Sequence, residues 1–597
     1  MFLRSTRRWK DGKEHRYWSI VENRRGTGKT PVQRQVLYLG EINDSQKAAW
    51  CHSIEVWEAG SEQWRQVALF PEDREAPELA QEVIHIRLDQ LQVERPRQWG
   101  ACWLAGELWR QLRLDSFWEQ RLPVSREGTD WLKILKTLVA YRLIDPGSEW
   151  RLHRQWYPHT AMGDLLDRSE EAIELHALYR CLDKLLAHKE DFFHFLSERW
   201  RDLFQAGYEI LLYDLTSTYF ECDPPGEGKR RHGYSRDKRP DCVQVVIALV
   251  ITPDGLPLAY EVMAGNTSEK TTLKKFLEKI EQRYGKANRT WVMDRGIPTE
   301  EVLREMREGP GSVLYLVGTP RGRLTRLEKE FLQLPWIQVK GFVEVKLLPQ
   351  QGELYVLALS QGRRQKERAM RRRRLKQLWK RLQELQRQKL SRDDLLLKLG
   401  AAKRDAGNAW RLVEVDVPAA SDTADAQSFT FSLRKDKLRA AFRSEGRYLL
   451  RSNDLSGTDP AILWQRYVQL TEIEAVFRNL KGPLLIRPIH HRTDARIEAH
   501  IFVAFLAYCL YVTLQQRLRA LAPGLTSRAV IEKLATIQMV DVVLPTTDGR
   551  VLVLPRYTQP QGDQQLLLQR LHLVLPAQPP PRISSRAESP AREVVAM

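Results

Sequence analysis

The sequence predicts an α/β fold in which a mixed β-sheet is flanked by helices and interrupted by an insertion. Short apolar or β-branched runs, typical of buried strands, occupy residues 208–214, 243–251, 255–262, 290–294 and 313–317. An amphipathic stretch at 270–283 has the apolar spacing of a helix. Strands interrupted by a helix indicate a sheet with helices packed on its faces.

The rest of the chain divides into segments of different composition. Strand-like stretches at 17–22 and 32–39, on either side of a polar loop, predict a basic β-rich N-terminal segment over residues 1–75. Apolar residues at helical spacing predict a helical region over 78–205, either a DNA-binding domain or a packing scaffold. The other expected boundaries are 206–321 and 446–545 for the sheet domain, 322–445 for the insertion, 546–576 for a C-terminal extension and 577–597 for a disordered tail.

Within the second part of the sheet domain, residues 446–452 predict a further strand. Helical spacing then predicts one helix over about 459–480 and another over about 495–518. The most apolar stretch of the latter, residues 501–514, is too short to span a bilayer. It is therefore expected to be a buried core helix.

The charge of the chain points to a polyanionic partner. Its 597 residues carry a formal net charge of +18, and the sequence pI is about 9.6. Such an imbalance favours nucleic acid, with an anionic membrane surface second and a generally basic solvated surface as the remaining interpretation. The six cysteines form no C-x-x-C pair, which argues against a zinc ribbon or a disulfide framework and fits a reducing cytoplasm.

A strongly basic helix is predicted inside the insertion. Residues 363–392 contain fourteen Lys or Arg and two Glu, and apolar residues among them keep helical spacing. One interpretation is a solvated surface helix. We favour a helix that lies along DNA phosphates, because many like charges on one helix repel each other without counter-charges. The candidate contacts are Arg371, Arg372, Arg373 and Arg374.

Two aspartates end apolar runs of the predicted sheet. Asp214 ends the run at 208–214, and Asp294 ends the run at 290–294. Strand ends give side chains a rigid support beside solvent, and carboxylate oxygens are the ligands that Mg²⁺ prefers. Two divalent ions held in this way serve phosphodiester chemistry. Aspartates at strand ends also cap turns, so this pattern alone leaves both interpretations open.

The residues around these aspartates resemble a known family. Residues 213–220 (Tyr-Asp-Leu-Thr-Ser-Thr-Tyr-Phe), 233–241 (Gly-Tyr-Ser-Arg-Asp-Lys-Arg-Pro-Asp), 255–258, 265–268 and 292–296 (Val-Met-Asp-Arg-Gly) are similar to motifs of the DDE transposases of bacterial insertion sequences. Residues 467–481 resemble the Y-x2-R-x3-E-x6-K signature of the insertion-sequence-four-like branch. Tyr467, Glu474 and Lys481 occupy matching positions, whereas Leu470 replaces the signature arginine.

The spacing of the signature is consistent with a site. Positions seven apart share a helix face, so Tyr467, Glu474 and Lys481 are expected to form one stripe. Glu472, the rival carboxylate, projects about 200° away from Glu474. A surface salt bridge between Glu474 and Lys481 is the alternative. The role of the missing arginine moves to Arg466 or Arg478, or stays in doubt.

The resemblance implies a ribonuclease-H-like catalytic core, with both aspartates on the sheet, the glutamate on a helix and an insertion before that helix. It implies that Asp214, Asp294 and Glu474 are catalytic and bind Mg²⁺, with Mn²⁺ as a substitute. It further implies DNA contacts by Tyr467, Lys481, Arg295 and Arg478. Arg295 could equally form a structural ion pair.

The activity implied is transposition. The protein is expected to bind the terminal inverted repeats of its element, cleave the ends and join the 3′-hydroxyls to target DNA. A homodimer in a synaptic complex, a cytoplasmic and nucleoid-associated location in a bacterium, and no membrane or small-molecule partner are expected. The alternatives are a metal-dependent nuclease or resolvase of the same fold and a non-catalytic DNA-binding relative.

Overall fold

The computed structural model describes residues 2–10, 13–24, 32–41, 54–58, 63–67, 84–167, 173–221, 228–267, 273, 278–281, 289–294, 297–309, 313–319, 321–341, 343–388, 390–417, 429–456 and 459–584. The chain forms two compact units. The first comprises Met1–Lys189, Leu480–Ile486 and Ala495–Met597, and the second comprises Glu190–Asn479 and Arg487–Asp494.

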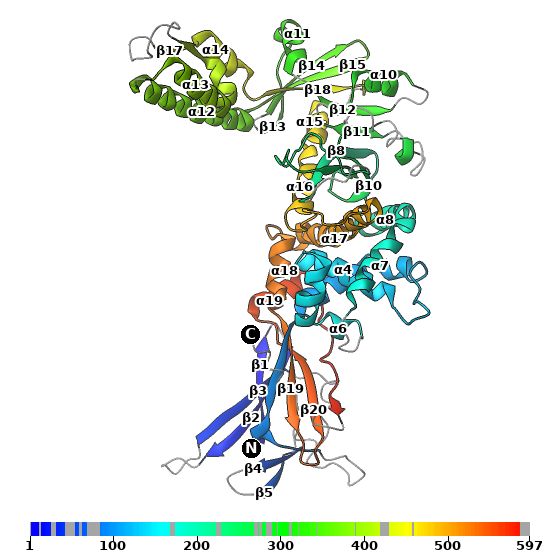
Figure 1. Cartoon of the computed structure of the whole chain (residues 1–597). Helices are drawn as coiled ribbons and strands as arrows, with labels where there is room; N and C mark the ends of the chain where they lie inside the picture. Colours follow the sequence, from blue (N-terminus) through cyan, green and yellow to red (C-terminus); the bar gives the residue numbers. More distant parts are fainter. Residues whose placement is uncertain are drawn as a thin grey trace. The chain divides into compact units, whose positions relative to one another are not determined.

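The second unit contains a nine-stranded mixed sheet (Figure 1), with strand order β10-β9-β8-β11-β12-β18-β15-β14-β13. The strands are β8 (Ile210–Tyr219), β9 (Gln244–Ile251), β10 (Pro257–Ala264), β11 (Thr290–Met293), β12 (Leu314–Thr319), β13 (Ile337–Lys340), β14 (Val343–Gln350), β15 (Glu353–Ser360) and β18 (Arg447–Ser452). The strands β8, β11 and β12 run parallel, and all other neighbours in the sheet are antiparallel. The predicted mixed sheet is confirmed.

The strands form where apolar and β-branched residues cluster. Strand β9 is buried along almost its whole length, as its continuous run of valine, isoleucine and leucine predicts. The turn from β9 to β10 uses Gly255, whose φ of +87° is a conformation that side chains disfavour. The hairpin predicted from Pro253-Asp254-Gly255 is therefore confirmed.

The insertion contributes to this sheet. Strands β13, β14 and β15 come from the segment expected to interrupt the fold, and β15 pairs with β18. Strand β18 also pairs with β12, so the sheet continues through it without a gap. No strands were expected over residues 337–360. Strands β13 and β14 lie towards the sheet edge and mix polar with apolar residues, which hides their pattern, whereas β15 is a buried apolar run whose composition does favour a strand.

Helices of the second unit lie between or after these strands. They are α8 (Lys189–Phe204), α10 (Glu300–Glu308), α11 (Arg321–Leu332), α12 (Gln361–Arg387), α13 (Arg392–Ala406), α14 (Lys435–Ser444), α15 (Pro460–Val468) and α16 (Leu470–Lys481). The basic helix predicted in the insertion is α12. Leu378, Leu382 and Leu385 of α12 pack with α13 in a separate small core. The hairpin of β16 (Val413–Asp416) and β17 (Thr430–Leu433) adjoins this core, and Figure 1 shows the group together.

In the part of the first unit that the structure describes, there are three further sheets. Their strands are β1 (Phe2–Lys10), β2 (Lys13–Arg24), β3 (Val32–Glu41), β4 (Ile54–Glu58), β5 (Gln63–Val67), β6 (Ile84–Ile86), β7 (Gln92–Gln98), β19 (Gln538–Pro545), β20 (Val551–Tyr557) and β21 (Arg582–Ser584). The antiparallel pairing of β2 with β3 confirms the N-terminal strand pair, whereas its predicted loop lies largely outside the described residues.

The α-helices of the first unit are α2 (Gly100–Gln111), α3 (Leu114–Trp118), α4 (Trp131–Ile144), α5 (Glu149–Arg151), α6 (Met162–Leu165), α7 (Leu175–Leu185), α17 (Asp494–Leu521), α18 (Ser527–Ala535) and α19 (Gly562–Arg570). The helix α17 is long and apolar enough to cross a membrane, but 94% of its most apolar window is buried within the protein. Such burial is typical of a core helix, as predicted.

Two expectations for the first unit are corrected. The region 78–205 is not wholly helical, because β7 lies within it and pairs with β19, more than 430 residues later. The disorder expected from residue 577 is not found up to Ser584, because β21 pairs with β20. In addition, the amide of Gln578 exchanges hydrogen bonds of 3.0 Å with the backbone N–H and carbonyl of Tyr557. Residues 585–597 lie outside the described residues.

Candidate active site

The register of two parallel strands brings Asp214 and Asp294 to the same level of the sheet. Strand β11 pairs with β8 so that Met293 lies opposite Tyr213, and each aspartate is the next residue of its chain. Neighbouring strands lie about 4.8 Å apart, so the two aspartates start from adjacent backbone positions. This spacing is compatible with carboxylates that share a pair of divalent ions.

Asp294 follows β11 directly, as predicted, but Asp214 does not end its strand. Strand β8 continues through Leu215, Thr216 and Thr218 to Tyr219, because these β-branched, apolar and aromatic residues also favour a strand. Residues 214–219 keep their pairing with β9, while β11 has already ended on their other side. The backbone edge of β8 beyond Asp214 is therefore not paired with β11.

The surroundings of the two carboxylates differ. The side chain of Asp214 is 15% exposed, and its Oδ1 lies 3.6 Å from Nη1 of Arg236. Asp294 is exposed. Its carboxylate accepts no hydrogen bond from the described residues and forms no ion pair with them. The carboxylate of Asp214 thus already attracts the guanidinium of Arg236. The carboxylate oxygens of Asp294 have no partner among the described residues.

The signature residues do not lie on one continuous helix. Helix α15 ends at Val468, and α16 begins at Leu470 after a turn residue. The hydroxyl of Thr471 donates a 2.8 Å hydrogen bond to the carbonyl of Val468. Hydrogen bonds of this kind compete with the regular backbone pattern and bend helices. The single helix predicted over 459–480 is therefore wrong, and Tyr467 precedes the break.

Glu474, Arg478 and Lys481 share one face of α16. On a regular helix, Arg478 projects about 40° and Lys481 about 20° from the direction of Glu474. Glu474 and Arg478 are exposed, and Lys481 is half-buried. Glu474 forms no ion pair or hydrogen bond with any described side chain, so the alternative of a Glu474–Lys481 salt bridge is not found there.

Both flanks of α16 are attached to the strands that carry the aspartates. Helix α15, before it, lies against β11 and β12. After it, the backbone N–H of Ile489 donates a 3.3 Å hydrogen bond to the carbonyl of Tyr219, the last residue of β8. The helix with Glu474 is thus held between attachments to the strands of Asp294 and Asp214.

The position of the missing signature arginine is apolar. Leu470 is 8% exposed and belongs to the buried side of the helix. Arg466 lies 3.7 Å from Asp454, in an ion pair that fixes α15. Arg478 is exposed on the face of Glu474. Of the two replacements considered, Arg478 is therefore the one on the face of Glu474.

Tyr467 keeps an aromatic contact. Its ring stacks on Tyr448 of β18, with ring centroids 5.9 Å apart and an angle of 25° between the planes. Trp464 donates its indole N–H to the hydroxyl of Tyr448. Tyr467 is half-buried at this position, which leaves part of its surface accessible.

The arginines predicted to contact DNA from α12 divide into two groups. Arg371 is 12% exposed, and its Nε donates a 2.5 Å hydrogen bond to Glu445, while its guanidinium lies 4.2 Å from the ring centre of Phe442. Arg372, Arg373 and Arg374 are exposed. Arg371 therefore attaches α12 to the segment around α14, and the next three arginines face solvent. Arg295 lies outside the described residues.

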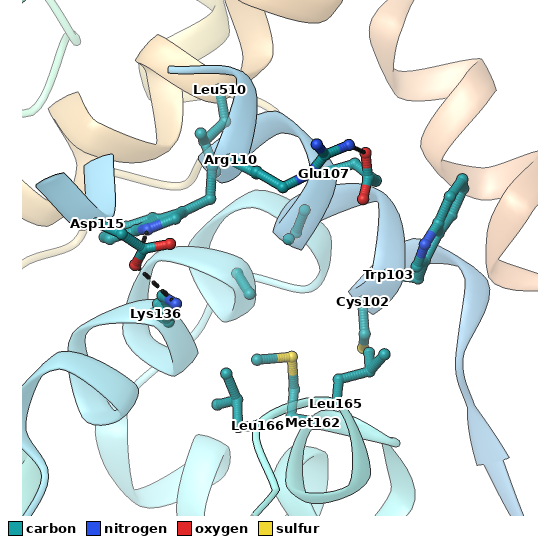
Figure 2. A pocket seen from close by; sticks show the side chains of 14 residues that line it. Cys102, Trp103, Glu107, Arg110, Asp115, Lys136, Met162, Leu165, Leu166 and Leu510 are labelled. Atoms are coloured by element: carbon teal, nitrogen blue, oxygen red, sulfur yellow. Dashed lines mark hydrogen bonds and ion pairs between the residues drawn. The ribbon is translucent and has the colours of Figure 1, made fainter. Parts of the chain in front are cut away.

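The first unit contains a pocket whose lining differs from the candidate active site (Figure 2). Its volume is about 260 Å³, and α2, α4, α6 and α17 line it with Trp103, Met162 and Leu510 among other residues. The ion pairs Glu107–Arg110 and Asp115–Lys136 stand at its wall. Burial raises the pKa of the lining Cys102 thiol, which disfavours its reactive thiolate form at neutral pH. None of the three candidate carboxylates lines it.

Two family models match this chain, and one of them covers the residues of the candidate active site. The model "Transposase DDE domain" matches residues 206–510, more than half of the chain. The chain belongs to the DDE transposases. A second model, the N-terminal domain of IS1634 family transposases, matches residues 3–58 of this transposase. The two matches confirm the predicted family, the DDE transposases of insertion sequences.

Other comparisons add little to this assignment. None of the curated proteins matches the transposase. Six chains of known structure match, among them one in the cryo-EM structure of a piggyBac transposase synaptic complex with hairpin DNA. That chain is 9% identical, with 75% of this chain and 82% of that chain covered and a TM-score of 0.32. The family assignment rests on the two sequence models.

One residue of the candidate site was not expected from the sequence. Arg236 belongs to the motif at 233–241, which carried the family resemblance but no assigned role. Its approach to Asp214 requires the chain to return from β8 towards β9. The signal in the sequence was that Arg236 is a basic residue in the segment between two predicted strands, the first of which carries Asp214.

Proposed function

We propose that this transposase binds the terminal inverted repeats of its element, cleaves the element ends and joins the freed 3′-hydroxyls to target DNA. Asp214, Asp294 and Glu474 are the proposed catalytic carboxylates. The observation that carries the proposal is the register of β8 and β11, which sets Asp214 and Asp294 at one level. The attachment of α16 to both strands supports the inclusion of Glu474.

The donor set suits Mg²⁺, with Mn²⁺ as a substitute. Carboxylate oxygens are the preferred ligands of Mg²⁺, which keeps several waters and needs few protein ligands. Asp214, Asp294 and Glu474 would together hold the ions. Bound ions of this kind activate the attacking oxygen and stabilise the departing one. The exposed carboxylates of Asp294 and Glu474 are free of described partners, which fits this role.

Cationic and polar side chains around the carboxylates would hold the DNA. Arg478 and Lys481 share the Glu474 face, and Tyr467 stands just before it. Side chains of these types bind phosphate oxygens and fix the register of the strand without reading its sequence. The exposed Arg372, Arg373 and Arg374 of α12 would contact phosphates further along the duplex. Arg295 remains a proposed contact from the sequence alone.

The biological setting follows the same proposal. The protein would act on DNA in the bacterial cytoplasm, associated with the nucleoid, and two copies would hold the paired element ends. Its net charge of +18 favours association with DNA and is consistent with this setting.

The proposal is tested with linear DNA that carries the inverted repeat found beside the gene. Asp214→Asn and Glu474→Gln should abolish cleavage and joining in Mg²⁺, with the affinity for the repeat within about threefold of wild type. Glu472→Gln is the matched control, because Glu472 stands on the same helix but projects away from Glu474. It should cleave at close to the wild-type rate.

Two outcomes would count against the proposal. Full Mg²⁺-dependent cleavage by Asp214→Asn would remove this residue from the site, and equal losses in both glutamate variants would remove the special role of Glu474. A separate assay supplies DNA with pre-cut ends. Joining of these ends to target DNA supports a transposase, whereas cleavage without joining would identify a nuclease or resolvase.

A further inference from the structure

Between β8 and β9, the loop His232–Arg239 is held firmly near its start. Gly233 and Gly265 approach so closely that a Cβ on Gly233 would lie 2.0 Å from the carbonyl oxygen of Gly265. The side-chain amide of Gln244 donates to this same oxygen at 3.0 Å and to the carbonyl of Tyr234 at 3.1 Å. Only glycine allows such an approach, so the motifs at 233–241 and 265–268 form one contact.

The second half of the loop is attached to β8 and to the segment after α16. The hydroxyl of Ser217 accepts a 3.3 Å hydrogen bond from the backbone N–H of Arg236. Asp237, 6% exposed, forms an ion pair with Arg487. The guanidinium of Arg239 lies 5.0 Å from the ring centre of Tyr219. The loop is therefore supported along its whole described length.

This supported loop presents an aromatic ring and positive charges to solvent. Tyr234 is 86% exposed, although the backbone on both sides of it is fixed. Two residues later, Arg236 reaches to 3.6 Å from Asp214. Lys238 is exposed in the same loop. An exposed ring and cationic side chains on one loop are a combination that binds single-stranded nucleic acid, by stacking on bases and by contact with phosphates.

We propose that the loop His232–Arg239 binds an unpaired nucleotide of the DNA strand that is cut. The ring of Tyr234 stacks on the base, and Arg236 contacts the adjoining phosphate beside Asp214. The inference rests on the proposed function, because it places the cut strand at Asp214. Bases inside a duplex are already stacked, so the loop favours a frayed or single-stranded element end over intact duplex.

Fluorescence of 2-aminopurine tests this proposal. The base analogue is placed at each of several positions around the cut site of an element-end oligonucleotide, and binding is followed in EDTA. Wild type and Tyr234→Phe should quench the analogue at one position next to the cut, whereas Tyr234→Ala should not. Affinity of Tyr234→Ala for a single-stranded end should fall by about five- to 100-fold. Trp150→Ala, at a 53% exposed tryptophan of the first unit, is the matched control and should change neither value.

Arg236 has its own readout. The dependence of log affinity on log salt concentration should become less steep by about 0.7 in Arg236→Gln, because one phosphate contact to a single strand is lost. Arg236→Lys should restore the slope, since a cation remains. An unchanged slope in Arg236→Gln would overturn the proposed phosphate contact.

The controls separate this inference from the proposed function. Wild type should cut the same oligonucleotide after Mg²⁺ is added, and Asp214→Asn should not; failure here refutes the proposed function. If both behave as expected but Tyr234→Ala still quenches 2-aminopurine and binds as wild type, only the role of the loop is overturned. Quenching lost equally in Tyr234→Phe would also contradict stacking, because phenylalanine keeps the ring.

Discussion

Glu353 is a buried carboxylate at which strands β12, β15 and β18 meet, and its replacement by glutamine tests what holds them together. Its side chain is 2% exposed. Tyr315 and Tyr355 donate their hydroxyl groups to it, the latter at 3.1 Å, and Nε of Arg451 donates at 2.5 Å. Arg307 of α10 adds an ion pair at 3.1 Å. This network joins the insertion strands to the first part of the sheet.

The magnitude follows from the burial of the partners. Glu353→Gln keeps the shape but leaves Arg451, 5% exposed, with Glu300 as its one charged partner among the described residues. Burial disfavours the charged guanidinium, but hydrogen bonds to Glu353 and Glu300 outweigh it and raise the pKa of Arg451. Breaking a buried pair costs about 3–5 kcal/mol. Because Glu300 still accepts at 2.7 and 2.8 Å, we expect the lower end, about 3 kcal/mol.

Hydrogen exchange followed by mass spectrometry measures this loss locally. Peptides from β12, β15 and β18 should exchange about 150-fold faster in Glu353→Gln, the equivalent of about 3 kcal/mol in the opening equilibrium. The matched control is Glu308→Gln, because Glu308 pairs with Arg307 at 2.9 Å but is 59% exposed. An exposed pair contributes at most about 1 kcal/mol, so exchange should rise less than about fivefold. Exchange in Glu353→Gln within threefold of wild type, or equal to that of the control, would refute the reasoning.

Three further predictions concern charge and burial. Burial raises the pKa of Glu300, but hydrogen bonds from two arginines outweigh it and bring the pKa below its ordinary 4.5. The stability from this residue is present above pH 4.5 and lost as pH falls below it, so Glu300→Gln should lower Tm at pH 7, and its difference from wild type should shrink as pH falls below 4.5. Replacement of Arg372, Arg373 and Arg374 by alanine should reduce the salt dependence of duplex binding by about 2.7 in slope. Burial raises the pKa of Cys181 to about 12, so iodoacetamide should modify it only after unfolding.

Each of these predictions has a contradicting result. A difference in Tm between Glu300→Gln and wild type that stays as large well below pH 4.5 as at pH 7 would show that the charge of Glu300 is not the cause. The control is Arg404→Ala, which removes an 82% exposed arginine of α13. Its slope of log affinity against log salt concentration should differ from wild type by no more than about 0.9, the value for one phosphate contact. A loss equal to that of the triple variant would point to general charge attraction. Rapid native labelling of Cys181 would contradict its burial.

The sequence predicted the central strands because their residues are unambiguous. The runs of β8, β9, β10, β11 and β12 are short, apolar and bounded by turn residues, so local pattern and tertiary structure agree. Strands β7 and β21 were missed for the opposite reason. Strand β7 contains Glu94, Arg95 and Pro96 and is mostly exposed, and it forms only because β19 pairs with it from a distant part of the chain. The local amino-acid composition does not indicate pairing with a strand that is distant in the sequence.

The acidic residues of the candidate site could be predicted, but their geometry could not. Asp214 and Asp294 follow apolar runs that the sequence displays, whereas their common level depends on the parallel pairing of β8 with β11. The break before Glu474 was missed because the apolar spacing through Thr471 is that of a continuous helix. The bend follows from the hydrogen bond that the Thr471 hydroxyl donates to the Val468 carbonyl, which the sequence does not show. Arg236 was missed because a loop residue has no periodicity from which a direction could be read.

The central claim is that Asp214, Asp294 and Glu474 bind the same pair of divalent ions. Anomalous diffraction from crystals of the full chain grown with Mn²⁺ tests this claim most directly. We predict manganese peaks in contact with the carboxylates of both aspartates and of Glu474. Manganese bound by the aspartates with Glu474 more than about 12 Å away, or bound only at other residues, would contradict the account.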